Sequence, residues 1–353
     1  MILLIVAAAL ILACADNNGR VSDSGNDSLS EWKAWAESSE PGVFSAGHSV
    51  TTELVRNYGQ EESGIFYSPV AIDEKYGRLL VADDMNQRVL CFDSENGELL
   101  WSAGEAGEGP GHFSSIGDVA QSDSCVFAGS KYNNRVEIYS ICGEYQGSIQ
   151  AVHPFGLEVI GDSILVVTSL VEDHIVNLYS IETREKISSF GSMEAEYLWK
   201  RSPDNNTLTV TVVSDSIIVL AVETEAGFQT WNIFTEEMTE IEERRLPFEI
   251  PENTLTASYF HACDVTTMED SLICVLLTSM TTDKEPLVDR AGLNRLANIA
   301  VVDRYLLSGE YAASFVLPAL CYSIDASGSR FYTYHPVNQI VSEFQIVDTA
   351  EFQ

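Results

Sequence analysis

Short apolar runs separated by polar turns make up most of this chain. From about Val50 onward these runs alternate with turns rich in Asp, Ser and Gly, and no segment shows a convincing amphipathic helix. Asp, Ser and Gly accept the backbone geometry of a tight turn and satisfy its free amides, so each pair of runs predicts a β-hairpin. Six such hairpins are predicted, at residues 70–83, 116–129, 155–168, 208–222, 263–277 and 320–334.

A third apolar run follows each hairpin, and a fourth follows most of them. The third runs are 88–93, 135–140, 175–180, 228–233, 298–303 and 340–345, and the fourth runs that the pattern reveals are 98–104, 145–150, 186–191 and 311–317. Repeated four-stranded meanders are typical of propeller blades. The sequence therefore predicts an all-β, six-bladed β-propeller.

The last unit ends soon after its third strand, whereas residues 51–58 form a spare strand before the first unit. Pairing of these two segments would complete the last blade and remove an open sheet edge. We therefore expect an N-terminal strand to close the ring.

The first blade resembles an NHL-type repeat, the kind found in six-bladed propellers of the TolB-like group. The residues that carry the resemblance are Pro69, Asp83, Asn86, Arg88, Phe92, Asp93 and Gly97, and the second blade keeps Asn134, Arg135 and Val136. The resemblance covers about 68–150 and is one of general pattern elsewhere. It implies the fold but hardly any function, because propellers host enzymes and inert scaffolds alike.

Asp83 and Arg88 flank a short loop between two strands of the first blade. An Asp and an Arg so placed can bridge the loop and hold the blade together, as a surface-type pair worth up to about 1 kcal/mol. Arg135 recurs in the second blade without the paired acids, which is typical of a structural repeat. We therefore predict structural roles for Asp83, Arg88 and Arg135.

The chain begins with an uninterrupted apolar run from Met1 to Ala13 that is too short to span a bilayer but suits a secretory signal. Residues 11–14 resemble the bacterial lipobox, which implies cleavage after residue 13 and lipidation of Cys14. No Lys or Arg precedes the run, and an ordinary signal peptide cut nearby is the alternative. We expect a signal peptide over 1–13, a lipidated tether over 14–46 and a propeller over 47–353. The predicted location is the bacterial cell envelope, on the periplasmic or outer-surface side.

The formal net charge is −34, from 19 Lys and Arg against 53 Asp and Glu. Such a surface repels phosphate backbones, which excludes nucleic-acid binding. Local signatures of hydrolases, such as Gly-x-Ser-x-Gly and His-Glu-x-x-His, are absent from the sequence. The sequence therefore favours a protein that is not an enzyme, and we expect it to be a monomer.

Acidic residues lie on three of the predicted innermost strands: Asp118, Glu158 and Asp264. Innermost strands converge on the central channel of a propeller, where gathered carboxylates could hold Ca²⁺. A resemblance to gluconolactonase-like six-bladed hydrolases would also imply a metal there. The alternative is a wet polar channel without a metal.

The long connector 279–296 interrupts the fifth blade and carries Lys284, Arg290 and Arg295 in an otherwise acidic chain. A long loop at this position predicts a lid or a partner contact, and an idle insertion is the alternative. The favoured function is a non-enzymatic binding or scaffold module that uses this ring face for a ligand or protein. A metal-dependent lactonase or esterase is the rival, and carbohydrate binding through exposed aromatics is a third hypothesis.

Export would place the cysteines in an oxidising compartment. Cys125 and Cys142 lie at one end of the second blade, where a disulfide bond is plausible. Cys91, Cys263, Cys274 and Cys321 lie in apolar strands and are expected to be buried.

Overall fold

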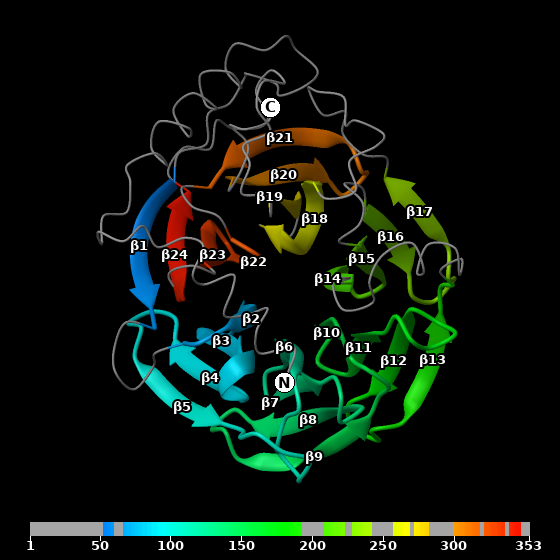
Figure 1. The fold of residues 1–353 in the computed structure, drawn as a ribbon. Helices are drawn as coiled ribbons and strands as arrows, with labels where there is room; N and C mark the ends of the chain where they lie inside the picture. Colours follow the sequence, from blue (N-terminus) through cyan, green and yellow to red (C-terminus); the bar gives the residue numbers. More distant parts are fainter. Residues whose placement is uncertain are drawn as a thin grey trace.

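The computed structural model describes residues 52–59, 66–192, 208–222, 228–241, 257–268, 272–281, 299–317, 321–335 and 339–346. They form a ring of six antiparallel sheets of four strands each (Figure 1). The predicted six-bladed β-propeller is therefore confirmed. In this part of the chain no helix is long and apolar enough to cross a membrane.

Blades 1 to 3 follow one another along the chain, each with its first strand innermost. Blade 1 comprises β2 (Pro69–Lys75), β3 (Arg78–Asp83), β4 (Arg88–Asp93) and β5 (Leu99–Ala103), with a 3-10 helix η1 (Asp84–Asn86) between β3 and β4. Blade 2 comprises β6 (Ile116–Gln121), β7 (Cys125–Ser130), β8 (Arg135–Ser140) and β9 (Tyr145–Gln150). Blade 3 comprises β10 (Leu157–Ile160), β11 (Ile164–Thr168), β12 (Val176–Ser180) and β13 (Lys186–Phe190).

Blades 4 to 6 repeat this order. Blade 4 comprises β14 (Leu208–Ser214), β15 (Ile217–Val222), β16 (Phe228–Asn232) and β17 (Met238–Ile241). Blade 5 comprises β18 (Ala257–Met268), β19 (Leu272–Thr281), β20 (Ile299–Leu306) and β21 (Tyr311–Val316). Blade 6 comprises β22 (Ser323–Ser327), β23 (Arg330–His335), β24 (Ile340–Ile346) and the N-terminal β1 (Thr52–Tyr58).

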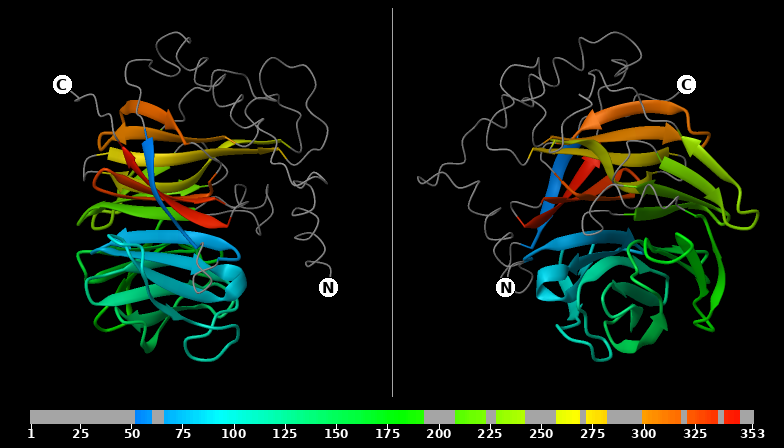
Figure 2. Two further views of the ribbon diagram at one scale, coloured as in Figure 1. Left: turned by 90° about the vertical axis from the view of Figure 1, so that its left-hand side faces the viewer. Right: turned by 45° about the vertical axis from the view of Figure 1, so that its right-hand side comes forward.

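The ring has two faces, which we name by the loops that they carry. The connector face carries the loops between the second and third strands of each blade and the connections between blades. The hairpin face carries the two tight turns of each blade. Figure 2 shows that β18 and β19, the longest strands at 12 and 10 residues, project beyond the others on one side. Ala257 pairs with Thr281 at the projecting end, which is on the connector face.

Strand β1 closes the ring, as the sequence predicts. It pairs antiparallel with β24 from Thr52 opposite Ile346 to Tyr58 opposite Val341. The buried carboxylate of Glu343 on β24 accepts the Tyr58 hydroxyl at 2.9 Å. From the same strand, Arg56 donates to the carbonyl oxygen of Glu95 in blade 1 at 2.9 Å. These contacts fasten the closing strand both to its own blade and to the next one.

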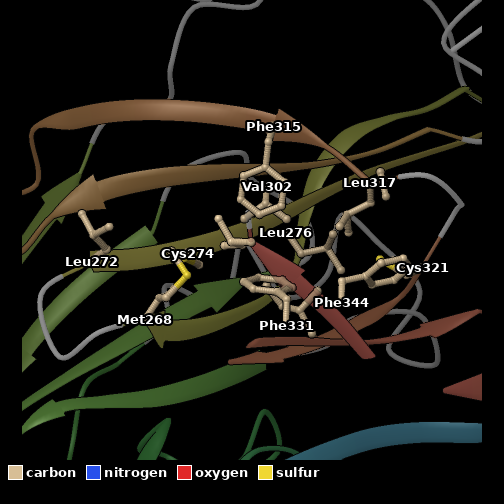
Figure 3. Close-up of a cluster of buried hydrophobic side chains, with 13 residues drawn as sticks. Met268, Leu272, Cys274, Leu276, Val302, Phe315, Leu317, Cys321, Phe331 and Phe344 are labelled. Atoms are coloured by element: carbon tan, nitrogen blue, oxygen red, sulfur yellow. The ribbon is translucent and has the colours of Figure 1, made fainter. Parts of the chain in front are cut away.

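Apolar side chains from facing sheets form the core between blades. Figure 3 shows one such cluster, in which Phe315 of blade 5 meets Phe331 of blade 6 edge to face, with ring centroids 5.6 Å apart. Burial of a side chain of this size stabilises the fold by about 1.5–3 kcal/mol. The hydrophobic runs of the sequence therefore place each sheet against its neighbours.

Two details differ from the sequence analysis. The fourth strand of blade 4, β17, has no hydrophobic alternation because three of its four residues are exposed, and the apolar pattern does not reveal it. Cys125 and Cys142 are free thiols, so the plausible disulfide between them is not formed. Cys91, Cys274 and Cys321 are buried as expected, whereas the side chain of Cys263 lies outside the described residues.

Candidate functional site

Asp83 is a buried acceptor that organises the start of blade 1. Its carboxylate accepts the backbone N–H groups of Tyr67 and Ser68 at 3.0 and 2.9 Å, and the Asn86 amide at 2.7 Å. Arg88 lies beside it, with Nε 3.4 Å from Oδ2. The pair has the structural arrangement that the sequence predicts, but Asp83 is fully buried, so it is not the surface-type pair expected.

Arg135 fastens the glycine-rich connector between blades 1 and 2. It donates to the carbonyl oxygens of Glu108 and Gly109, and its guanidinium pairs with the buried carboxylate of Glu137. Its acidic partner therefore lies two residues along the same strand instead of across the loop. Its contacts are structural.

Asp118 on β6 joins blade 2 to blade 3. One carboxylate oxygen accepts the backbone N–H of Leu157, the first residue of β10, at 2.7 Å. The other accepts the N–H of Val119, the next residue in its own strand, at 2.8 Å. Burial raises the pKa of Asp118 well above its usual range. The side chain thus links two innermost strands through hydrogen bonds.

The same kind of contact joins blade 5 to blade 6 and blade 6 to blade 1. Asp264 on β18 accepts the N–H of Ile324 on β22 at 2.9 Å, and Asp325 on β22 accepts the N–H of Glu74 on β2. Each carboxylate also accepts the N–H of the residue that follows it. Burial raises the pKa of Asp264 to about 6. Acids near the ring axis therefore bind backbone amides of the adjacent blade.

Glu158, the third predicted metal ligand, lies against a cation of the protein itself. The Lys75 Nζ atom is 2.5 Å from Glu158 Oε1 and joins blade 1 to blade 3. Burial by itself lowers the pKa of Lys75, but the charges of Glu158, Asp73 and Asp325 together raise it above its ordinary value. Lys75 is thus the counter-ion of several carboxylates on the innermost strands.

Asp73 lies close to Lys75 and has an incomplete set of hydrogen bonds. It is 6% exposed, and its Oδ2 atom has no hydrogen-bond partner in the described part of the chain. Burial raises the pKa of Asp73 to about 7, against the opposing effect of Lys75. This carboxyl group therefore changes its charge near neutral pH.

The three predicted metal ligands lie on innermost strands as expected, and Asp118 interacts electrostatically with both Asp264 and Glu158. However, the described residues contain no group of three or more His, Cys, Asp or Glu side chains that could hold a metal ion. Backbone amides and the Lys75 ammonium already engage these carboxylates and would compete with Ca²⁺. Calcium binding here stays a prediction.

A second group of side chains lies on the connector face. The Tyr132 ring meets the His153 ring edge to face at 5.5 Å, and the His153 ring lies 4.9 Å from that of Phe155. The Lys131 ammonium lies over the Phe155 ring, 5.5 Å from its centroid. We name Lys131, Tyr132, His153 and Phe155 the Tyr132 cluster. Tyr132 is its most accessible member, at 64% exposed.

Local backbone geometry brings the two parts of the Tyr132 cluster together. Asn134 adopts a left-handed conformation (φ 54°) that Asn tolerates, and its side chain accepts the His153 N–H at 3.0 Å. Gly117 on β6 leaves room for the 154–155 backbone, because a Cβ atom there would lie 2.4 Å from the Pro154 carbonyl oxygen. The β7–β8 loop and the connector to blade 3 therefore meet beside the innermost strand.

The Tyr132 cluster has hydrogen-bonding groups that no described residue engages. The Lys131 ammonium makes no hydrogen bond or ion pair within the described part of the chain, although Asp84 and Asp118 lie near enough to raise its pKa. Burial outweighs these charges and lowers the pKa of Lys131. Burial and the nearby Lys131 also lower the pKa of His153, which favours the neutral form of its imidazole.

Sequence reasoning missed this cluster, although it also favoured the connector face for binding. One signal was available: Lys131 is one of few cations in a strongly acidic chain and stands next to Tyr132 in a loop of the connector face. The residues that the sequence did single out on this face, Lys284, Arg290 and Arg295, lie outside the described residues, as does Cys14.

Comparisons with known proteins identify the architecture. No protein-family model and no curated protein matches the chain. Among solved structures, a member of the DUF4221 family from Bacteroides vulgatus is similar, with a TM-score of 0.58 and 9% identity over 86% of this chain and 99% of that one. The two chains share the β-propeller fold. The similarity at this level of identity shows the fold alone.

Two further structures are similar to the chain. One is a protein from Bacteroides fragilis described as exported, with a TM-score of 0.55 and 12% identity over 84% of this chain and 96% of that one. The other is virginiamycin B lyase from Staphylococcus aureus, with a TM-score of 0.51 and 11% identity over 85% of this chain and 100% of that one. Propellers with such different descriptions do not identify a function for this chain.

Proposed function

We propose that this protein is a non-enzymatic binding propeller of the bacterial cell envelope, held there by a lipid on Cys14, with its ligand on the connector face. The Tyr132 cluster carries the proposal. It combines an exposed aromatic ring with an ammonium and an imidazole that have no hydrogen-bond partner among the described residues. Unused polar groups beside exposed aromatic surface are typical of ligand sites.

Neighbouring loops of the same face support this placement. Met85 of blade 1 and Val171 of blade 3 are 57% and 59% exposed and occupy the loops that correspond to the Tyr132 loop. Exposed apolar residues such as Phe234 also occur on the hairpin face, but Phe234 makes no ring contact with another described residue. The Tyr132 cluster differs from Phe234 in these ring contacts, and it differs from the hairpin-face Tyr76, whose hydroxyl already donates to Asp162 at 2.8 Å.

The innermost strands support a binding role over the rival hydrolase. Asp118 and Asp264 use both carboxylate oxygens for backbone amides, and Glu158 pairs with Lys75. These contacts give the acids a role in joining the blades, and this role does not require catalysis. The resemblance of blade 1 to NHL-type repeats is compatible with this proposal and adds no activity to it.

Hydrogen exchange of the purified full-length protein, with and without an extract of the source envelope, tests the proposal. We expect the extract to slow amide exchange in 131–134 and 152–155 on the connector face. The turns at 141–144 and 233–236 on the hairpin face provide the internal control and should be unaffected. Protection confined to the hairpin face, or no protection at all, would contradict the proposal.

A further inference from the structure

The charges around the Tyr132 cluster restrict the ligand that it could take. Lys131 is the cation that the described residues place at this site, and Asp84 and Asp118 both act on its pKa. Burial and Lys131 lower the pKa of His153, which favours its neutral form. The field around Lys131 thus combines its ammonium with two nearby acidic side chains, on a protein of net charge −34. This field repels an anion, while a cationic ligand would meet the Lys131 ammonium.

The unused atoms favour a ligand rich in oxygen. The ammonium of Lys131 donates hydrogen bonds, and the neutral imidazole of His153 has one donor and one acceptor nitrogen. Hydroxyl groups can satisfy all of these atoms because each hydroxyl both donates and accepts. Asp84 and Asp118 keep lone pairs beyond the amide bonds that they already accept.

The exposed Tyr132 ring provides the apolar half of the site. A sugar ring has one face of C–H groups, which packs on the electron-rich face of an aromatic ring, and hydroxyls around its edge. The 64% exposure of Tyr132 leaves that ring accessible. The Tyr132 cluster therefore matches the two chemical halves of a sugar.

We propose that the Tyr132 cluster binds a neutral sugar ring. The C–H face of the sugar packs on Tyr132. The sugar hydroxyls accept hydrogen bonds from the Lys131 ammonium. They also donate to one ring nitrogen of His153 and accept from the other. The inference rests on the proposed function, because it assigns a ligand class to the same face.

Saturation-transfer NMR with the full-length protein tests this assignment. The probes are neutral di- and trisaccharides of glucose, galactose, mannose and N-acetylglucosamine, together with the corresponding uronic-acid oligomers. We expect transfer to at least one neutral sugar, with an affinity that changes little between low and high salt, since a neutral ligand has no ion pair to screen.

Variants link the signal to the site. Tyr132→Ala should weaken the neutral sugar about fivefold to tenfold, as the loss of one aromatic contact does, and Lys131→Met should weaken it similarly. Phe234→Ala, which removes an exposed ring from the hairpin face, is the matched control and should leave affinity unchanged. Melting curves of each variant show that it is folded.

The outcomes separate this inference from the proposed function. Preference for the uronic acids, with affinity that falls as salt rises, would overturn the neutral-sugar assignment. So would envelope-dependent protection of 131–134 and 152–155 without binding of any sugar in the panel, a result that leaves the proposed function intact. Absence of both protection and sugar binding would contradict both.

Discussion

Lys75 and Glu158 form an ion pair between the innermost strands of blades 1 and 3, with Nζ and Oε1 2.5 Å apart. The pair links two blades that are not sequential neighbours, and the charges of Asp73, Glu158 and Asp325 all act on its ammonium. A cation bound by these carboxylates would compete with the Lys75 ammonium for them. The pair therefore bears directly on the calcium hypothesis.

Replacement of Lys75 should allow these carboxylates to bind an added cation. In Lys75→Met the three acids lose their counter-ion, and we expect the unfolding free energy to fall by about 1–2 kcal/mol at pH 7, a value reduced because the lysine side chain is 35% exposed. Added Ca²⁺ should restore part of this loss, as a ligand of the native state does. Melting curves with EDTA, Ca²⁺ or Mg²⁺ measure the effect.

The wild-type protein provides the comparison for that experiment. We expect Ca²⁺ and Mg²⁺ to shift its melting temperature equally, through screening of the acidic surface. A shift selective for Ca²⁺ that disappears in Asp118→Ala or Glu158→Ala would instead support the metal-dependent hydrolase.

Asp73 should make the stability of the propeller depend on pH. Its native pKa, raised to about 7 by burial, lies above the value in an unfolded chain. The native state therefore binds more protons between about pH 4 and 7, and stability falls as pH rises through that window. Asp73→Asn should stabilise the protein by roughly 1–3 kcal/mol at pH 8 and have little effect at pH 4. Urea unfolding at both pH values measures this, and an equal effect at the two would contradict the prediction.

Asp83 should be a major determinant of stability in blade 1. Asp83→Ala leaves the N–H groups of Tyr67 and Ser68 and the side chain of Asn86 without their acceptor. We expect a loss of about 2–4 kcal/mol in urea unfolding, from several hydrogen bonds to one buried charge. Asp173→Ala, at an exposed acid, is the control and should change stability by less than about 0.5 kcal/mol. Equal effects of the two variants would argue against a structural role for Asp83.

The six-bladed architecture could be predicted from the sequence because the patterns that specify its strands and turns are local. Alternating apolar runs and turn residues identified all six hairpins, and a spare run near Thr52–Tyr58 identified the closing strand. Strand β17 escaped because its side chains are exposed and lack the apolar pattern. The apolar pattern reveals a strand only where one of its faces is buried, and this outer strand is mostly exposed.

The candidate site could not be predicted in the same way. Asp118 and Asp264 were correctly placed on innermost strands, but their partners are amides of another blade, and the packing between blades decides which amides they reach. The Tyr132 cluster depends on the left-handed turn at Asn134 and on the space beside Gly117. Neither feature has a distinctive periodicity in the sequence.

The lipid anchor is a separate prediction about the start of the chain. Intact-mass analysis of the membrane fraction should show a chain that begins at Cys14 with added acyl mass. Cys14→Ser should release the protein from that fraction, because the lipid chains provide the membrane affinity. An unmodified wild-type chain in the soluble fraction would refute the anchor.

Site-specific photo-cross-linking tests the central claim most directly. A photoreactive amino acid replaces Tyr132 on the connector face or, in a matched variant, Phe234 on the hairpin face, which is 71% exposed. Each full-length protein is illuminated in the envelope of the source cells, and adducts are detected by mass. We expect a defined adduct from position 132 and none from position 234. Adducts from position 234 alone, or equal labelling from both positions, would contradict it.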